Sequence, residues 1–72
     1  MEKTLVLYAD DKKCGVIRYT DIKIGKDHYI YGGEKKYIYE VYIYLNENCI
    51  FSAIDKKEII KQDKKLFIYN FN

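Results

Sequence analysis

Few side chains in this sequence are suited to covalent or acid–base catalysis. His28 is the only histidine and it follows Asp27, so a nucleophilic dyad would need a serine or cysteine held beside it. Cys14 and Ser52 are the candidate nucleophiles, but no motif around either residue supports that role. We therefore expect His28 to be a solvated strand residue and the protein to be non-enzymatic.

Candidate metal and phosphate sites are equally weak. Asp10 and Asp11 are adjacent acids of the kind that solvate a turn between strands. Gly32 and Gly33 lack the following Gly-Lys-Ser or Gly-Lys-Thr of a phosphate-binding loop, and turn geometry explains both glycines. The sequence predicts no metal and no cofactor.

The composition is that of one small folded domain, residues 1–72. A chain of this length buries only about 60% of the surface that it exposes when unfolded, so its single core is marginal and a dimer would add burial. Of its residues 49% are hydrophobic, with nine tyrosines and no proline, which favours a β-rich fold. The net charge of +2 is too small to mark a nucleic-acid or membrane-surface binder.

Individual residues bear on nucleic-acid recognition, on the state of the cysteines and on the location of the protein. Arg18 is the only arginine, which weakens the case for specific base readout. Cys14 and Cys49 match no short-spaced metal or redox motif, and we expect two buried, reduced thiols. Glu2 lies where a signal peptide would be basic, and no apolar run of about 18 residues exists. We expect a cytoplasmic protein that does not contact a membrane.

Short β-branched and aromatic segments separated by turn residues predict strands at 4–8, 14–19, 22–24, 28–31, 37–45, 49–54 and 66–71. The second and third of these form one bent strand or two, and the third ends at Gly25. Gly32 and Gly33 make the turn of the clearest hairpin, and Asn46 to Asn48 make the next turn. Residues 28–54 are therefore predicted to be a three-stranded antiparallel meander.

Asp55 and Glu58 have the spacing of a capping box, which predicts a short helical turn near residues 55–62. The elements then follow in the order strand, excursion, three-stranded meander, helical turn and final strand. This is the general order of SH3-like small barrels, although no motif ties the chain to a particular family. We expect a mainly β fold in which an antiparallel sheet of five or six strands closes into an SH3-like barrel.

The long strand 37–45 has two different faces, because side chains alternate along a strand. Its odd-numbered residues form the expected core face, which leaves the tyrosine-rich even-numbered face outward or covered by the helical turn or the terminal strand. Tyrosine is enriched in binding hot spots, so we predict a small protein-binding module or homodimer. The predicted partner-binding residues are Ile38, Glu40, Tyr42 and Tyr44 of this face and Phe67, Tyr69 and Phe71 of the terminal strand.

Two other functions are compatible with the sequence. A single-stranded nucleic-acid binder would use the lysines and tyrosines of the hairpin, namely Lys35, Lys36, Tyr37 and Tyr39. Lysine pairs that flank apolar strands also serve simply to suppress aggregation. Alternatively, heavy use of Lys, Ile, Tyr and Asn suggests an AT-rich genome, and thus a virus- or plasmid-encoded inhibitor of a host enzyme or defence complex.

Overall fold

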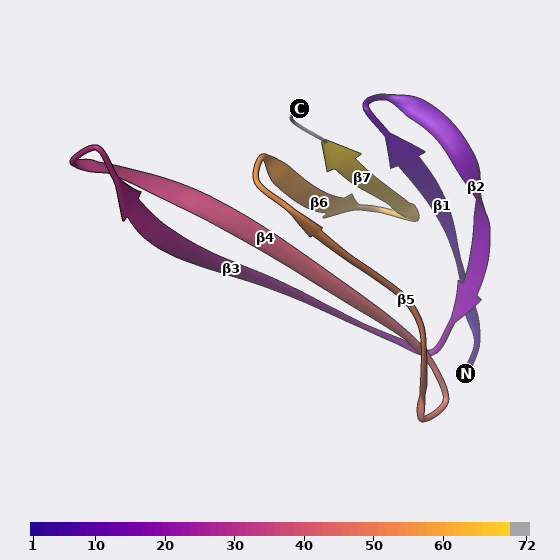
Figure 1. Ribbon diagram of the computed structural model, residues 1–72. Helices are drawn as coiled ribbons and strands as arrows, with labels where there is room; N and C mark the ends of the chain where they lie inside the picture. Colours follow the sequence, from indigo (N-terminus) through magenta and orange to yellow (C-terminus); the bar gives the residue numbers. More distant parts are fainter. Residues whose placement is uncertain (70–72) are drawn as a thin grey trace.

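The computed structural model describes residues 1–69, within which the chain forms seven β-strands and no helix (Figure 1). The mainly β fold expected from the composition is confirmed. No helix in these residues is long and apolar enough to cross a membrane. The strands are β1 (Lys3–Ala9), β2 (Lys12–Tyr19), β3 (Asp21–Tyr31), β4 (Glu34–Leu45), β5 (Asn48–Asp55), β6 (Glu58–Gln62) and β7 (Lys65–Tyr69).

The strands form two sheets that enclose one core. The first sheet has the order β2-β1-β7-β6 and the second has the order β3-β4-β5. All neighbouring strands are antiparallel except β1 and β7, which run parallel. Both sheets contribute to the core, so neither buries its apolar face without the other. The buried hydrophobic residues are Leu5, Tyr19, Val41, Ile43, Ile59, Leu66 and Ile68.

The expected closure into an SH3-like barrel is wrong, because no ladder joins the two sheets within residues 1–69. The reason is the place of the terminal strand. β7 pairs with β1 on one side and with β6 on the other, so it lies inside the first sheet and offers no edge to the second. Its two neighbours satisfy both of its backbone edges, the core between the sheets covers Leu66 and Ile68, and the fold is an open two-layer structure.

The helical turn expected near residues 55–62 is also wrong, because β6 occupies that segment and raises the strand count to seven. The Asp55 carboxylate accepts a hydrogen bond from the backbone N–H of Lys57 at 2.8 Å, and the turn that this bond stabilises leads into the extended backbone of β6. Ile59 is buried and Ile60 is exposed, which is the alternation of a strand. Two adjacent β-branched residues also favour extended backbone over helix.

The chain passes from the first sheet to the second at Thr20. Its backbone N–H donates to the carbonyl of Tyr44 at 2.7 Å, and its hydroxyl accepts a hydrogen bond from the N–H of Asn46 at 2.7 Å. The hydroxyl also donates to the Tyr44 carbonyl at 3.2 Å. These bonds fix the base of β3 against the end of β4, so the β3–β4 hairpin leaves the body of the protein in a defined direction.

The β3–β4 hairpin is longer than the sequence predicts. Its ladder runs without a bulge from the pair Asp21–Tyr44 to the pair Tyr31–Glu34, and β3 continues through Gly25, where an end was expected. Because neither face of this part of the hairpin is buried, the apolar periodicity that would reveal the strand is missing.

The outer part of the hairpin projects from the body, as Figure 1 shows. We call residues 25–38 the arm; none of their side chains is buried. Gly32 and Gly33 close it with φ angles of 60° and 78°, the left-handed conformation that a two-residue hairpin turn needs. The radius of gyration is 13.2 Å, whereas a compact domain of this length has about 11 Å. The arm therefore extends the molecule well beyond its core.

Candidate functional site

The arm exposes large apolar side chains that the core does not use. Ile30 and Tyr31, beside the turn, are 66% and 73% exposed, and Tyr29 and Tyr37 are exposed as well. The molecule presents 5420 Å² to solvent, against about 4700 Å² for a compact protein of 8.7 kDa. The arm thus combines exposed aromatic and aliphatic side chains with charged ones on a projection that adds nothing to the core, which makes it a candidate interaction site.

The two faces of the β3–β4 hairpin differ in charge. The inner face, on the side of the buried Val41 and Ile43, is formed by even-numbered residues of β3 and odd-numbered residues of β4. It carries Lys26, His28 and Lys35 and no acidic residue. The outer face carries more acids than lysines, namely Asp21, Asp27, Glu34 and Glu40 with Lys23 and Lys36. The two faces therefore suit ligands of opposite charge.

Four of the predicted partner-binding residues lie together on the outer face of β4. Ile38, Glu40, Tyr42 and Tyr44 are each half-buried. The Tyr42 hydroxyl donates to Glu40 Oε2 at 2.9 Å, and Lys23 Nζ lies 5.6 Å from the centroid of the Tyr44 ring. The sequence allowed this face to be covered by a helical turn or by the terminal strand. The segment of the expected helical turn is the strand β6, and the terminal strand β7 belongs to the other sheet.

Residues of β3 and β5 widen this surface. The cross-strand register places Tyr29 and Tyr31 on the outer face of β3, and it places Ile54 of β5 opposite Glu40. Ile54 is 67% exposed. Sequence reasoning missed all three, although counting pairs outward from the Gly32–Gly33 turn would have assigned the two tyrosines. We call this surface the outer tyrosine face, consisting of Tyr29, Tyr31, Ile38, Tyr42, Tyr44 and Ile54.

The predicted residues of the terminal strand lie elsewhere. Phe67 and Tyr69 point away from the core on the outside of the first sheet, because Leu66 and Ile68 point into it. The Phe67 ring stacks on Tyr8 with centroids 4.8 Å apart. The two sheets pack across the core, so this aromatic row and the outer tyrosine face lie on opposite sides of the molecule. Phe71 lies outside the described residues.

The residues predicted for nucleic-acid binding are split between the two faces. Lys35, Tyr37 and Tyr39 lie on the inner face, whereas Lys36 lies on the outer face and forms an ion pair with Glu34 at 2.9 Å. Lys26, which sequence reasoning missed because β3 was expected to end at Gly25, joins the inner group. Its Nζ lies 4.2 Å from the Tyr37 ring centroid and 5.5 Å from that of Tyr39, within the range of cation–π attraction.

The candidate catalytic side chains are dispersed. His28 is exposed on the arm opposite Tyr37, and its backbone N–H donates to the Asp27 carboxylate at 2.7 Å. Cys14 is on β2 and Ser52 is on β5, on different sheets from each other. In the part of the chain that the structure describes, no three His, Cys, Asp or Glu side chains are grouped as metal ligands.

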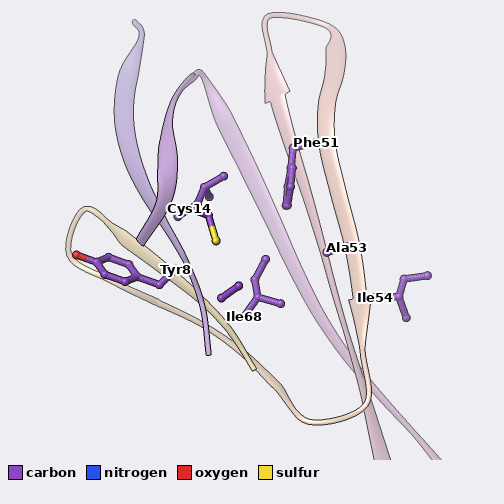
Figure 2. A pocket seen from close by; sticks show the side chains of 8 residues that line it. Tyr8, Cys14, Phe51, Ala53, Ile54 and Ile68 are labelled. Atoms are coloured by element: carbon purple, nitrogen blue, oxygen red, sulfur yellow. The ribbon is translucent and has the colours of Figure 1, made fainter. Parts of the chain in front are cut away.

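An apolar pocket of about 270 Å³ opens between the two sheets, where Cys14 and Ile68 lie across from Phe51 and Ala53 of β5 (Figure 2). Tyr8 also lines it, but its ring points away from β5. The Cys14 thiol donates to the carbonyl of Lys12 at 3.5 Å. Ligand pockets combine an apolar lining with several placed polar groups, and this lining offers little besides the thiol. The pocket therefore reflects the open packing of the sheets. Cys14 and Cys49 are free and exposed, so the expectation of buried thiols is wrong.

Two tyrosines have hydroxyl groups that ionise with difficulty. The hydrogen bond to Glu40 and its negative charge raise the pKa of Tyr42 above the ordinary value of 10.0. Partial burial and the nearby Asp11 carboxylate raise the pKa of Tyr69, whose hydroxyl lies 3.3 Å from Asp11 Oδ1. Both effects favour the neutral phenol.

Glu40→Gln is expected to lower the pKa of Tyr42 toward 10.0, because the amide removes the negative charge beside the phenol. A raised pKa in the folded state means that this hydrogen bond stabilises the fold below pH 10 and is lost as the pH rises through the pKa of Tyr42. An NMR titration of the tyrosine rings measures the shift. The matched control is Glu34→Gln, because Glu34 lies on the same face but pairs with Lys36. An equal shift in the pKa of Tyr42 in both variants would mean that Glu40 is not its cause.

Comparison of the chain with protein-family models, curated proteins and solved structures gives no match. The function is therefore argued from the geometry of the hairpin.

Proposed function

We propose that this protein is a protein-binding module whose partner docks on the outer tyrosine face. The observation that carries the proposal is the concentration of exposed and half-buried aromatic and aliphatic side chains on one side of a sheet that extends past its own core. The backbone ladder of the antiparallel hairpin presents these side chains at a lower entropy cost than a loop of the same length.

The chemistry of the face suits a protein surface. Tyrosine combines a large flat contact area with a hydroxyl that forms hydrogen bonds, and only two side-chain torsions must be fixed on binding. Tyr42 is already oriented by its hydrogen bond to Glu40, and Tyr44 lies against the Lys23 ammonium group. The acidic excess on this face favours a partner with a basic patch around an apolar centre.

The proposal is tested with Tyr42→Ala combined with Tyr44→Ala. The immobilised wild-type chain is used to capture and cross-link proteins from the cells that encode it, and the same experiment is run with the double variant. Each alanine removes a half-buried aromatic contact, so capture of any specific partner should fall at least about tenfold.

The matched control is Phe67→Ala combined with Tyr69→Ala, which removes two half-buried aromatic residues from the opposite side of the molecule. Circular dichroism establishes that each variant is folded. A partner captured equally by the wild type and the Tyr42/Tyr44 variant, or one lost only with the Phe67/Tyr69 variant, would contradict the proposed site.

A second candidate function, binding of single-stranded nucleic acid, is favoured by the acid-free inner face of the arm. Lys26 and Lys35 would contact phosphates, and Lys26 is held in place by the rings of Tyr37 and Tyr39. Fluorescence anisotropy with a labelled mixed-sequence oligonucleotide should then show steep salt dependence that Lys26→Gln plus Lys35→Gln abolishes. Lys36→Gln, on the outer face, should have a smaller effect; no binding at low salt would exclude this function.

A further inference from the structure

The strand β3 is an exposed edge of unusual length. It forms the edge of the β3-β4-β5 sheet, spans Asp21–Tyr31 and pairs with β4 without a bulge. Proteins usually protect such edges with proline, a bulge, a short strand or a covering segment, because free backbone N–H and C=O groups pair readily with another strand. β3 has no proline and no bulge and is not short, and no described strand other than β4 pairs with it, so its remaining protection comes from side chains.

The hydrogen-bond pattern identifies which backbone groups of β3 are free. The pair Tyr31–Glu34 flanks a two-residue turn, so odd-numbered residues of β3 exchange hydrogen bonds with β4 and even-numbered residues direct theirs to the free edge. The N–H groups of Ile22 and His28 support this assignment, since they donate to the neighbouring carboxylates of Asp21 and Asp27 at 2.9 and 2.7 Å.

The two aspartates therefore engage the N–H groups of Ile22 and His28, and the segment of the edge between them is open. Beyond His28, Ile30 also faces the free edge. The even-numbered residues within the open segment are Ile24 and Lys26, which flank Gly25, and no side-chain acceptor is found for their N–H groups among the described residues. A Cβ on Gly25 would meet nothing within 4 Å, so the edge is also uncrowded at its centre. This centre is the place where another strand could add.

We propose that a second copy of this chain adds to β3, antiparallel, with the two-fold axis at Gly25. This register places Ile24 opposite Lys26 of the second copy, and Ile22 opposite His28. Each of these pairs consists of residues whose backbone groups face the free edge, so each exchanges two hydrogen bonds. Gly25 lies opposite Gly25 of the second copy, in a pair that exchanges no backbone hydrogen bonds. The two strands are closest at such a pair, and glycine has no side chain that would clash there.

Charge complementarity selects a second copy and this register. Lys23 lies opposite Asp27 of the second copy, and the symmetry repeats the pair, so two opposite-charge contacts form on the outer face. A two-fold axis one residue further along, at Lys26, would instead place two ammonium groups opposite each other. In the dimer the Asp27 carboxylate releases the His28 N–H and pairs with Lys23 of the second copy. The His28 N–H then donates to the backbone of the second copy.

Dimerisation would join two three-stranded sheets edge to edge and place two outer tyrosine faces side by side. It uses the edge of the sheet and not its face, so it stands or fails independently of the proposed function. It also covers part of the arm, which the core leaves exposed.

The mass in solution tests the proposal, measured by sedimentation equilibrium from micromolar concentrations to about 0.5 mM, where even weak association is populated. The wild type should change from 8.7 kDa to twice that value. Lys26→Pro should keep the monomer mass throughout, because proline removes an N–H that faces the free edge and leaves the ladder to β4 intact. Lys23→Asp should weaken association at least about tenfold, by placing like charges opposite each other twice.

The charge swap decides the register. Lys23→Asp combined with Asp27→Lys should restore association to near the wild-type value, whereas Lys35→Asp, the same charge change on β4, should leave it unchanged. Tyr42→Ala plus Tyr44→Ala should also leave the dimer intact. A wild type that stays at 8.7 kDa at every concentration, or a dimer unaffected by Lys26→Pro, would overturn the proposal without bearing on capture by the outer tyrosine face.

Discussion

Leu66→Ala is expected to leave a large fraction of the protein unfolded at 25 °C. Leu66 is fully buried in β7, the strand that joins β1 to β6 in the first sheet, and it belongs to the core cluster to which both sheets contribute. Truncating a buried leucine costs about 3–4 kcal/mol, because apolar contacts are lost and a cavity remains. A single core of this size supplies only about 3–5 kcal/mol in total. Loss of one such side chain therefore removes nearly all of the free energy of unfolding.

Thermal and urea unfolding followed by circular dichroism at micromolar concentration, where association contributes least, measures this effect. The matched control is Ile60→Ala on β6, because Ile60 is 36% exposed and faces away from the core. That variant should lose less than about 1 kcal/mol. Equal losses in the two variants would mean that the core does not lie between the two sheets.

Shortening the arm is expected to leave the free energy of unfolding within about 1 kcal/mol of the wild type. Deleting residues 28–31 and 34–37 removes four cross-strand pairs and joins the Gly32–Gly33 turn to Asp27 and Ile38. The number of pairs removed is even, so every remaining side chain keeps its face. None of the deleted residues is buried, so the core loses no contact that would produce a large destabilisation.

Urea unfolding of the shortened chain beside the full chain measures this difference. The slope of the free energy against urea should fall slightly, because less surface is exposed on unfolding. A loss of several kcal/mol would show that the arm is part of the folding unit, and its length would then need no functional explanation.

The parts of the fold that could be predicted from the sequence are those where one face of a strand is buried. Val41 and Ile43 alternate with polar and aromatic residues, and this alternation assigned the inner and outer faces of β4 correctly. Gly32 and Gly33 mark the hairpin turn because glycine adopts their positive φ angles without steric cost.

The parts that failed have identifiable physical causes. The arm shows no useful periodicity around Gly25 because neither of its faces is buried, so β3 was divided in two. Asp55 and Glu58 match a capping box by spacing, but Asp55 accepts from the N–H two residues on and makes a turn. Barrel closure depends on which strands β7 pairs with, and its parallel pairing with β1, far away in the sequence, leaves no local signal.

The candidate site also has residues that the sequence could place and residues that it could not. Ile38, Glu40, Tyr42 and Tyr44 could be predicted because they share one strand and one face. Phe67 and Tyr69 could not be placed, since their position relative to β4 depends on how the two sheets pack. Lys26 escaped notice because its role depends on the rings of Tyr37 and Tyr39 across the hairpin.

Under the proposed function, the hairpin extends beyond the core because its outer part binds another protein. Capture and cross-linking with the arm-shortened chain, measured beside the full chain and after both are shown to be folded, tests this proposal. Because the shortened chain lacks Tyr29 and Tyr31 of the outer tyrosine face, we predict that capture of any partner falls at least about tenfold. Undiminished capture by a folded, arm-shortened chain would show that the arm is not part of the binding site.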